Sequence, residues 1–164
     1  MLNCAFRFLR LGIPLFAFCA QALGAEPSGV QAIDLTNTNA QLERRDQLVK
    51  EDDLRILIRA EELLDEPSAW NRRDDRECTD DESSGKRSLF CALQRACIDV
   101  LGAYEHRRVA LQEVRFAVED ATQGQDLAHR MMDFNNLPST QFTDIQAVLR
   151  IAKERVRQRL ESAR

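Results

Sequence analysis

Apolar residues recur at spacings of three and four along most of this chain, and this periodicity limits its fold more than any other feature. The spacing places one apolar stripe on each of several predicted helices. The clearest stripes cover residues 53–64, 88–102, 105–121 and 144–160, with weaker ones over 40–50 and 126–134. No stretch shows the alternation of a half-buried strand. The sequence therefore predicts an all-α fold, a small irregular bundle of four to five helices.

Local signals indicate where these helices begin and end. Asp52 or Asp53 is expected to cap the first strong helix, and Pro67 follows its end. Gly102 is expected to close the helix over 88–102, and Gly124 the helix after it.

The N-terminus has the pattern of a secretory signal peptide over residues 1–25. Arg7 and Arg10 precede an apolar run from Leu11 to about Ala20, and small residues follow. Cleavage is compatible with Ala22, Gly24 or Ala25. The apolar run is shorter than the roughly 20 residues of a membrane span, although retention as an anchor remains an alternative. We therefore expect a periplasmic or secreted protein.

The remainder divides into a flexible lead-in at 26–39 and a single helical domain at 40–164 with a long acidic loop at 66–87. The chain has 23 basic and 27 acidic residues, and both basic residues of the first 25 are arginines. Their removal leaves 21 basic residues against 27 acidic, a net charge of −6. Because such a chain is repelled by phosphate backbones, we expect no nucleic-acid partner.

Three cysteines remain after the signal segment, namely Cys78, Cys91 and Cys97. Since three is odd, at least one thiol stays free or pairs between chains. Cys91 and Cys97 are six residues apart on one predicted helix, about 9 Å along its axis. A disulfide tolerates a Cα separation of only about 7 Å. Cys97 lies on the apolar stripe and Cys91 off it, so Cys78 with Cys91 is the expected bridge, with three unpaired thiols as the alternative.

The acidic loop partly fits a calcium-binding template. Asp80, Glu82, Ser84 and Gly85 match its first positions. The template then fails, because Cys91 stands where a bidentate Glu is required. A solvated charged loop is the preferred interpretation, and no metal site is predicted.

Other candidate residues carry weaker signals. Trp70 is expected to close the core against the first strong helix. His106 and His129 lack the spacing of a metal pair. Arg107 and Arg108 are weighed as a grip for an anion, against a role as the polar start of a helix. No catalytic residue and no cofactor are predicted.

The last predicted helix is basic outside its apolar stripe. The cations there are Arg150, Lys153, Arg157 and Arg164. They would suit an anionic membrane surface, although interleaved glutamates favour a structural role.

Residues 134–149 gather polar side chains around Pro138. Thr143 and Gln146 fit a capping box, with Asp144 in the first turn. Asn135, Asn136 and Thr140 are not explained by local structure. These three are therefore the candidate polar site.

Two motifs resemble an uncharacterised bacterial family of helical domains. The first is a Ser-Leu-x-x-Ala-Leu helix, and the second an aromatic-Asn-Asn-x-Pro-x-Thr turn before an Asp-capped helix. The matching residues are Ser88, Leu89, Ala92 and Leu93, then Phe134, Asn135, Asn136, Pro138, Thr140, Asp144 and Leu149. The resemblance covers roughly residues 53–152. It implies a compact helical domain and brings no established activity.

These observations favour an exported, non-catalytic protein that binds another macromolecule, and we expect that partner to be a protein. One alternative is a small hydrolase or ligand-binding enzyme that uses Asn135, Asn136, Thr140 and Asp144. The other is a membrane-surface binder that uses the basic last helix. The oligomeric state is left open.

Overall fold

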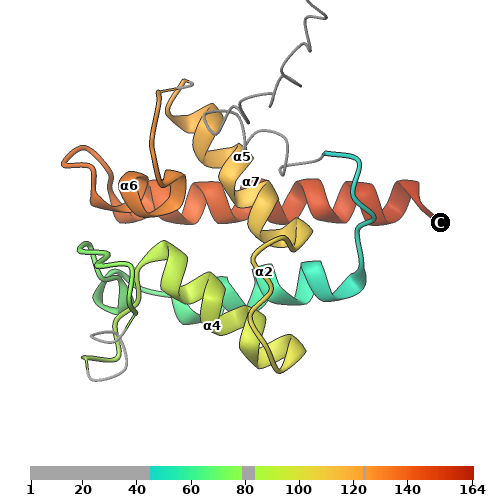
Figure 1. Ribbon diagram of the computed structural model, residues 1–164, viewed down its shortest axis with the longest axis horizontal. Coiled ribbons are helices and arrows are strands. Elements are labelled where there is room, and N and C mark those ends of the chain that lie inside the picture. The colour runs from blue at the N-terminus through green and yellow to red at the C-terminus, as the bar shows by residue number, and fades with distance from the viewer. Residues whose placement is uncertain (1–44, 79–83, 124) are drawn as a thin grey trace, which may run out of the picture. The chain divides into compact units, whose positions relative to one another are not determined.

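The structure, a computed structural model, describes residues 45–78, 84–123 and 125–164 of the 164-residue chain. These residues form α2 (Glu51–Leu63), the short 3-10 turn η2 (Pro67–Ala69), α4 (Leu89–Leu101), α5 (Val109–Ala121), α6 (Arg130–Asn136) and α7 (Phe142–Ser162). The described residues contain no sheet, only an isolated bridge between Trp70 and Arg87. The predicted all-α fold is confirmed (Figure 1).

Some expectations fall outside these residues. The signal segment at 1–25, the lead-in at 26–39, and Asp80 and Glu82 of the acidic loop are not among them. In the described part, no helix is both long enough and apolar enough to cross a membrane.

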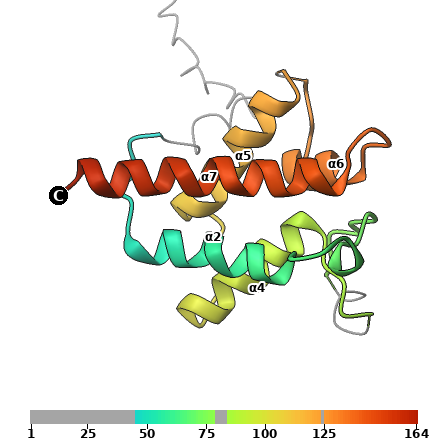
Figure 2. The ribbon, with the colours of Figure 1, turned by 180° about the vertical axis from the view of Figure 1, so that it is seen from behind.

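Helix α7 is the longest described helix, and it packs against both α2 and α5 (Figures 1 and 2). Helix α4 packs on α2, and the short α6 lies against α4 and α5. The predicted stripe of α7 faces inward, and its buried members are Ile145, Val148, Leu149, Ala152 and Val156. Burial of each large aliphatic side chain contributes about 1.5–3 kcal/mol. The core therefore draws most of its cohesion from contacts between helices distant in sequence.

Helix α4 begins and ends as its sequence indicates. The hydroxyl of Ser88 accepts a hydrogen bond from the amide of Cys91 at 3.2 Å, which satisfies one free donor of the first turn. Gly102 ends the helix with φ at 79°, a left-handed conformation that glycine adopts without strain.

The expected helix over residues 40–50 is wrong for the described part, because residues 45–50 form a turn followed by extended chain. The reason is tertiary. The backbone carbonyl of Gln47 accepts a hydrogen bond from Arg159, and its side chain accepts one from Gln112 at 2.8 Å. These contacts with α5 and α7 keep residues 45–50 out of a helical conformation.

The start of α2 is also earlier than expected. Lys50 is the N-cap, so Asp52 and Asp53 lie inside the first turn. Asp53 is the third helical residue, and its carboxylate accepts from the amide of Lys50 at 2.9 Å. The carboxylate thus reaches back to the cap as in a capping box.

Helix α5 begins at Val109, four residues later than expected, because residues 102–108 form a turn that carries the chain from α4. Helix α6 covers 130–136 where 126–134 was expected. Its start is fixed by the carboxylate of Asp133, which accepts from the amide of His129 at 2.7 Å.

The predicted capping box of α7, Thr143 with Gln146, is wrong by two residues. The cap is Gln141, whose amide donates to the carboxylate of Asp144 at 2.8 Å. The helix starts earlier because Phe142 belongs to its first turn, where its ring packs 6.1 Å from that of Trp70. A contact distant in sequence therefore decides which polar residue caps.

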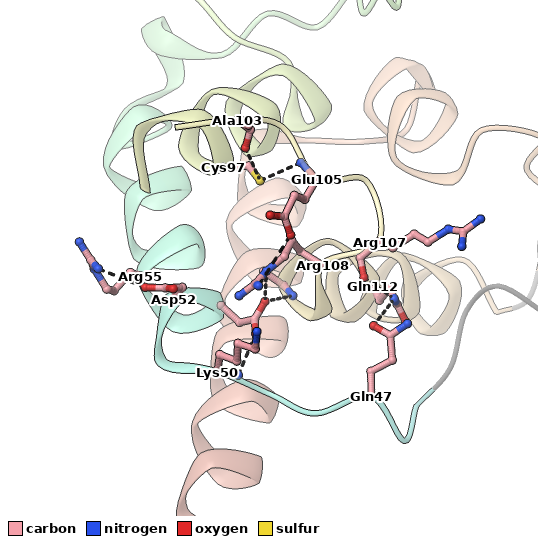
Figure 3. A network of polar contacts seen from close by, with 12 residues as sticks. Gln47, Lys50, Asp52, Arg55, Cys97, Ala103, Glu105, Arg107, Arg108 and Gln112 are labelled. Atoms are coloured by element: carbon pink, nitrogen blue, oxygen red, sulfur yellow. Dashed lines mark hydrogen bonds and ion pairs between the residues drawn. The ribbon is translucent and has the colours of Figure 1, made fainter. Parts of the chain in front are cut away.

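The carboxylate of Asp53 joins two helix starts. It is fully buried and accepts from the amide of Ala110 at 3.2 Å and from Nε of Arg108 at 3.1 Å, besides the amide of Lys50. Glu105 lies 3.8 Å from the same guanidinium (Figure 3). The N-termini of α2 and α5 therefore share one buried anion, which both helix dipoles favour.

We predict that Asp53→Asn lowers the free energy of unfolding by about 3 kcal/mol, because the Arg108 guanidinium, only 12% exposed, then keeps Glu105 at 3.8 Å as its remaining carboxylate. The matched control is Asp52→Asn. Asp52 is 40% exposed and pairs with Arg55 at 3.1 Å, so its loss is expected to cost about 0.5 kcal/mol or less. Urea unfolding followed by circular dichroism measures both, and equal stability of the two variants would contradict the proposed role of Asp53.

Candidate functional site

Asn135 is fully buried, and its carboxamide makes four hydrogen bonds within the fold. Its oxygen accepts from the indole N–H of Trp70 at 2.8 Å and from the amide of Leu89 at 3.1 Å. Its nitrogen donates to the carbonyl of Asn71 and to the side-chain oxygen of Asn136, each at 3.1 Å. Asn135 thus ties α6 to the loop after α2 and to the start of α4.

Asn136 lies beside Asn135 but binds a different group. Its side chain accepts from the amide of Asp74 at 2.8 Å and donates to the carbonyl of the same residue at 3.0 Å. Thr140 is not brought together with them, because its hydroxyl donates to the carbonyl of Phe134 at 2.7 Å. The polar groups of the three candidate site residues therefore bond to backbone groups and side chains of the fold itself.

Two further links fix residues 70–78 on α4. The hydroxyl of Ser88 donates to the carboxylate of Asp74 at 2.6 Å. Cys78 and Cys91 form a disulfide with their Cα atoms 5.5 Å apart, as expected from the sequence. Cys91 was expected off the core face, yet it is only 4% exposed, because the loop that carries Cys78 covers it.

Cys97 is the free cysteine of the described residues, and it is buried in the core. Its sulfur accepts a hydrogen bond from the amide of Glu105 at 3.3 Å. Burial raises the pKa of the Cys97 thiol, which keeps it in its unreactive neutral form.

Trp70 packs against the core as expected. Its ring centroid lies 6.1 Å from that of Phe142 at the start of α7, a neighbour that the sequence did not indicate. The hydrogen bond from its indole N–H to Asn135 sets this direction, because a buried N–H needs an acceptor.

The histidines and the acidic loop show no metal geometry in the described residues, where no group of three or more ligating side chains converges. His106 lies within hydrogen-bond distance of Tyr104 Oη, at 2.9 Å, and of the guanidinium of Arg115, at 3.2 Å. Its ring is therefore engaged by neighbours of its own fold.

The cations of α7 are largely matched by carboxylates of this chain. The pairs are Lys153 with Glu61, Arg155 with Asp120, Arg157 with Glu154, Arg159 with Glu113 and Arg164 with Glu51. Since these pairs neutralise much of the helix, its face offers less free positive charge than the sequence pattern indicates.

A pocket of about 530 Å³ opens between residues 47–50 and the start of α5. We call it the Arg108 pocket. Its lining comprises Gln47, Leu48, Lys50, Asp53, Glu105, His106, Arg107, Arg108 and Val109. Figure 3 shows Arg107 extending away from the buried network, while Lys50, Glu105 and Arg108 gather near the start of α5.

The pocket combines an apolar and a basic feature. Leu48 is 75% exposed, so its apolar surface is open to solvent at the cavity. Lys50 and Arg107 are exposed beside it. Arg108 is only 12% exposed, and its buried Nη2 has no hydrogen-bond partner. The arrangement suits an acidic ligand that also brings an apolar group.

Sequence reasoning found part of this pocket. It weighed Arg107 and Arg108 as an anion grip, and both line the cavity. It missed Leu48 and Lys50, because residues 40–50 were expected to be helical. The sequence signal was a leucine, Leu48, within a polar segment. That signal becomes informative only when the segment is known to be extended.

We predict that Asn135→Ala lowers the free energy of unfolding by about 3 kcal/mol, because the buried amide of Leu89 and the indole N–H of the half-buried Trp70 lose their acceptor. Asn136→Ala is the matched control. Asn136 is exposed, so water can replace its partners and a loss of about 1 kcal/mol is expected. Thermal and urea denaturation measure both, and an Asn135→Ala variant no less stable than its neighbour would refute the anchoring role.

We predict that the three cysteines beyond the first 25 residues differ in reactivity. Cys97 should react with iodoacetamide only after denaturation, and Cys78 and Cys91 only after reduction. Peptide mass spectrometry assigns the label to each residue. Rapid labelling of Cys97 in the native protein would show that its thiol is accessible, contrary to the structure.

One family of proteins shares this sequence pattern. The family described as a family of unknown function (DUF6197) matches residues 49–155. That range includes residues 53–152, over which the chain resembles an uncharacterised helical family. No curated protein and no solved structure matches the chain.

Proposed function

Because the chain belongs to the family of unknown function DUF6197, we propose a function from its own geometry: it is an exported, non-catalytic protein that binds an acidic segment of a partner protein at the Arg108 pocket. The observation that carries the proposal is the exposed Leu48 beside a pocket with basic residues. The N-terminal signal pattern supports export.

Energetics favour a protein segment as the occupant. Interfaces take most of their affinity from a few side chains, among which Trp, Tyr and Arg are enriched. Arg107 and Arg108 line the pocket and are of this kind. Leu48 supplies apolar area that is already exposed, so its burial by a partner would be favourable. Lys50 and Arg107 would attract carboxylates and orient them.

The charge of the whole chain sharpens this preference. The full sequence carries a net charge of −4, so an acidic partner is repelled over much of the surface. The lining holds Lys50, Arg107 and Arg108 against Asp53 and Glu105, so its cations exceed its carboxylates by one and an acidic segment is favoured there. An acidic partner would therefore be favoured at this pocket and repelled over much of the remaining surface.

The two alternatives have less support. The side chains of Asn135, Asn136 and Thr140 are engaged with groups of the fold, and the carboxylate of Asp144 accepts from the amide of Gln141 at the start of α7. A hydrolase would need such groups directed toward a substrate. The cations of α7 are mostly paired within the chain, which weakens an electrostatic membrane role.

We predict that Leu48→Ser and Arg107→Glu each abolish partner recovery from a native envelope extract, whereas Ile151→Ser and Arg150→Glu do not. Ile151 is a 37% exposed apolar residue and Arg150 an exposed cation, both on α7. Quantitative co-purification with crosslinking provides the measurement.

Salt dependence separates the electrostatic contribution of Lys50 and Arg107 from the apolar contribution of Leu48. Binding by wild type should weaken as ionic strength rises, because Lys50 and Arg107 are exposed. Fractionation of the cells that provide the extract should place the protein outside the cytoplasm. Equal recovery by all four variants would overturn the site, and an exclusively cytoplasmic protein would overturn export.

A further inference from the structure

A second pocket, of about 440 Å³, is lined by the C-terminal half of α7, by α5 and by the segment before α2. We call it the Arg155 pocket. Its lining residues are Arg45, Glu113, Arg155, Gln158, Arg159 and Ser162. From their arrangement we propose that it is a binding site for a phosphoryl group.

The three arginines are held by the fold before any ligand arrives. The guanidinium of Arg45 lies 3.9 Å from the ring centroid of Phe116. Arg159 donates to Glu113 at 2.6 Å and also to the carbonyl of Gln47. Because these contacts already restrict the side chains, a ligand would cost little additional ordering.

The charges of the lining are not balanced. Three arginines face a single carboxylate, that of Glu113, and Arg159 occupies it. Asp120 lies outside the lining and pairs with Nη2 of Arg155 at 2.5 Å. Positive charge therefore remains within the pocket after both carboxylates are counted.

Arg155 adds a second, independent observation. Its Nη1 is buried and has no hydrogen-bond partner, although its Nη2 is paired. A buried donor without an acceptor is unfavourable, and a charged donor more so. A small shift of the side chain would let an oxyanion in the pocket accept from it.

A phosphoryl group fits this donor set better than a single carboxylate. Guanidinium groups bind oxyanions through paired N–H donors. A carboxylate presents two oxygens in one plane, whereas a phosphoryl group presents three around a tetrahedral centre. Arginines that come from both α7 and the segment before α2 can therefore contact one phosphoryl group from different directions.

The site is separate from the Arg108 pocket. Arg45 lines this cavity, whereas Leu48 and Lys50 of the same segment line the other. Its occupancy does not depend on the proposed partner binding. A negative result for one pocket therefore does not contradict the proposal for the other.

The test uses the full chain and inorganic phosphate at constant ionic strength, followed by calorimetric titration. Wild type should bind one phosphate per chain. Arg45→Gln and Arg155→Gln should each weaken binding by at least roughly tenfold, the effect of losing a charged hydrogen bond. The matched control, Arg157→Gln, lies on the same helix but outside the lining and should bind as wild type does.

A second measurement on wild type guards against variants that do not fold. Phosphate should protect Arg45 and Arg155 from modification by phenylglyoxal, without protecting Arg157, as read by peptide mass spectrometry. Phosphatidic acid vesicles, whose headgroup is a phosphate monoester with three terminal oxygens, distinguish a lipid headgroup from a soluble phosphate, with phosphatidylcholine vesicles as the control.

Each outcome decides the matter. Saturable binding of inorganic phosphate with selective protection supports a soluble phosphate ligand. Binding to phosphatidic acid vesicles that Arg155→Gln abolishes, without binding of free phosphate, supports a headgroup. Equal loss in Arg157→Gln, or no binding to either probe, overturns the proposal.

Discussion

The carboxamide of Asn135 is the contact on which the arrangement around α6 depends. It offers one acceptor to two buried donors, and one amino group to two acceptors, from three separate segments. A buried polar group without a partner costs more than its hydrogen bond contributes when made. The loop after α2, the start of α4 and α6 are therefore stable only in one relative position.

Asp53 imposes a similar condition at the other end of α2. Its carboxylate serves the starts of α2 and α5 together, and the buried Arg108 depends on it for charge balance. Asp53 thus fixes the start of α2, and Asn135 fixes the loop that follows its end. The apolar contacts provide most of the stabilising free energy, while these two residues select the packing.

Much of the fold follows from local patterns, and the exceptions have a common cause. The stripes of α4 and α7, the cap at Ser88 and the stop at Gly102 need only neighbouring residues to be recognised. The extended segment at 45–50 depends on Gln112 and Arg159, which lie at least 65 residues away in sequence. No window of local sequence contains that information.

The candidate sites divide along the same line. Asn135 and Asn136 attracted interest because local structure left them unexplained. They bond to each other, and their other partners lie more than 40 residues away in sequence. Arg107 and Arg108 could be suspected from their clustering, but the pocket also needs Leu48 to be exposed. The sequence therefore shows which chemical groups each residue carries, but not which distant residues the fold brings together.

The place of α7 in the chain has a consequence for biosynthesis. Helices α2 and α5 both pack against it, and it follows them in the sequence. As the polypeptide leaves the ribosome, these earlier helices must wait for their shared partner. During that interval their apolar faces remain available to a chaperone, so translation order itself delays closure of the core.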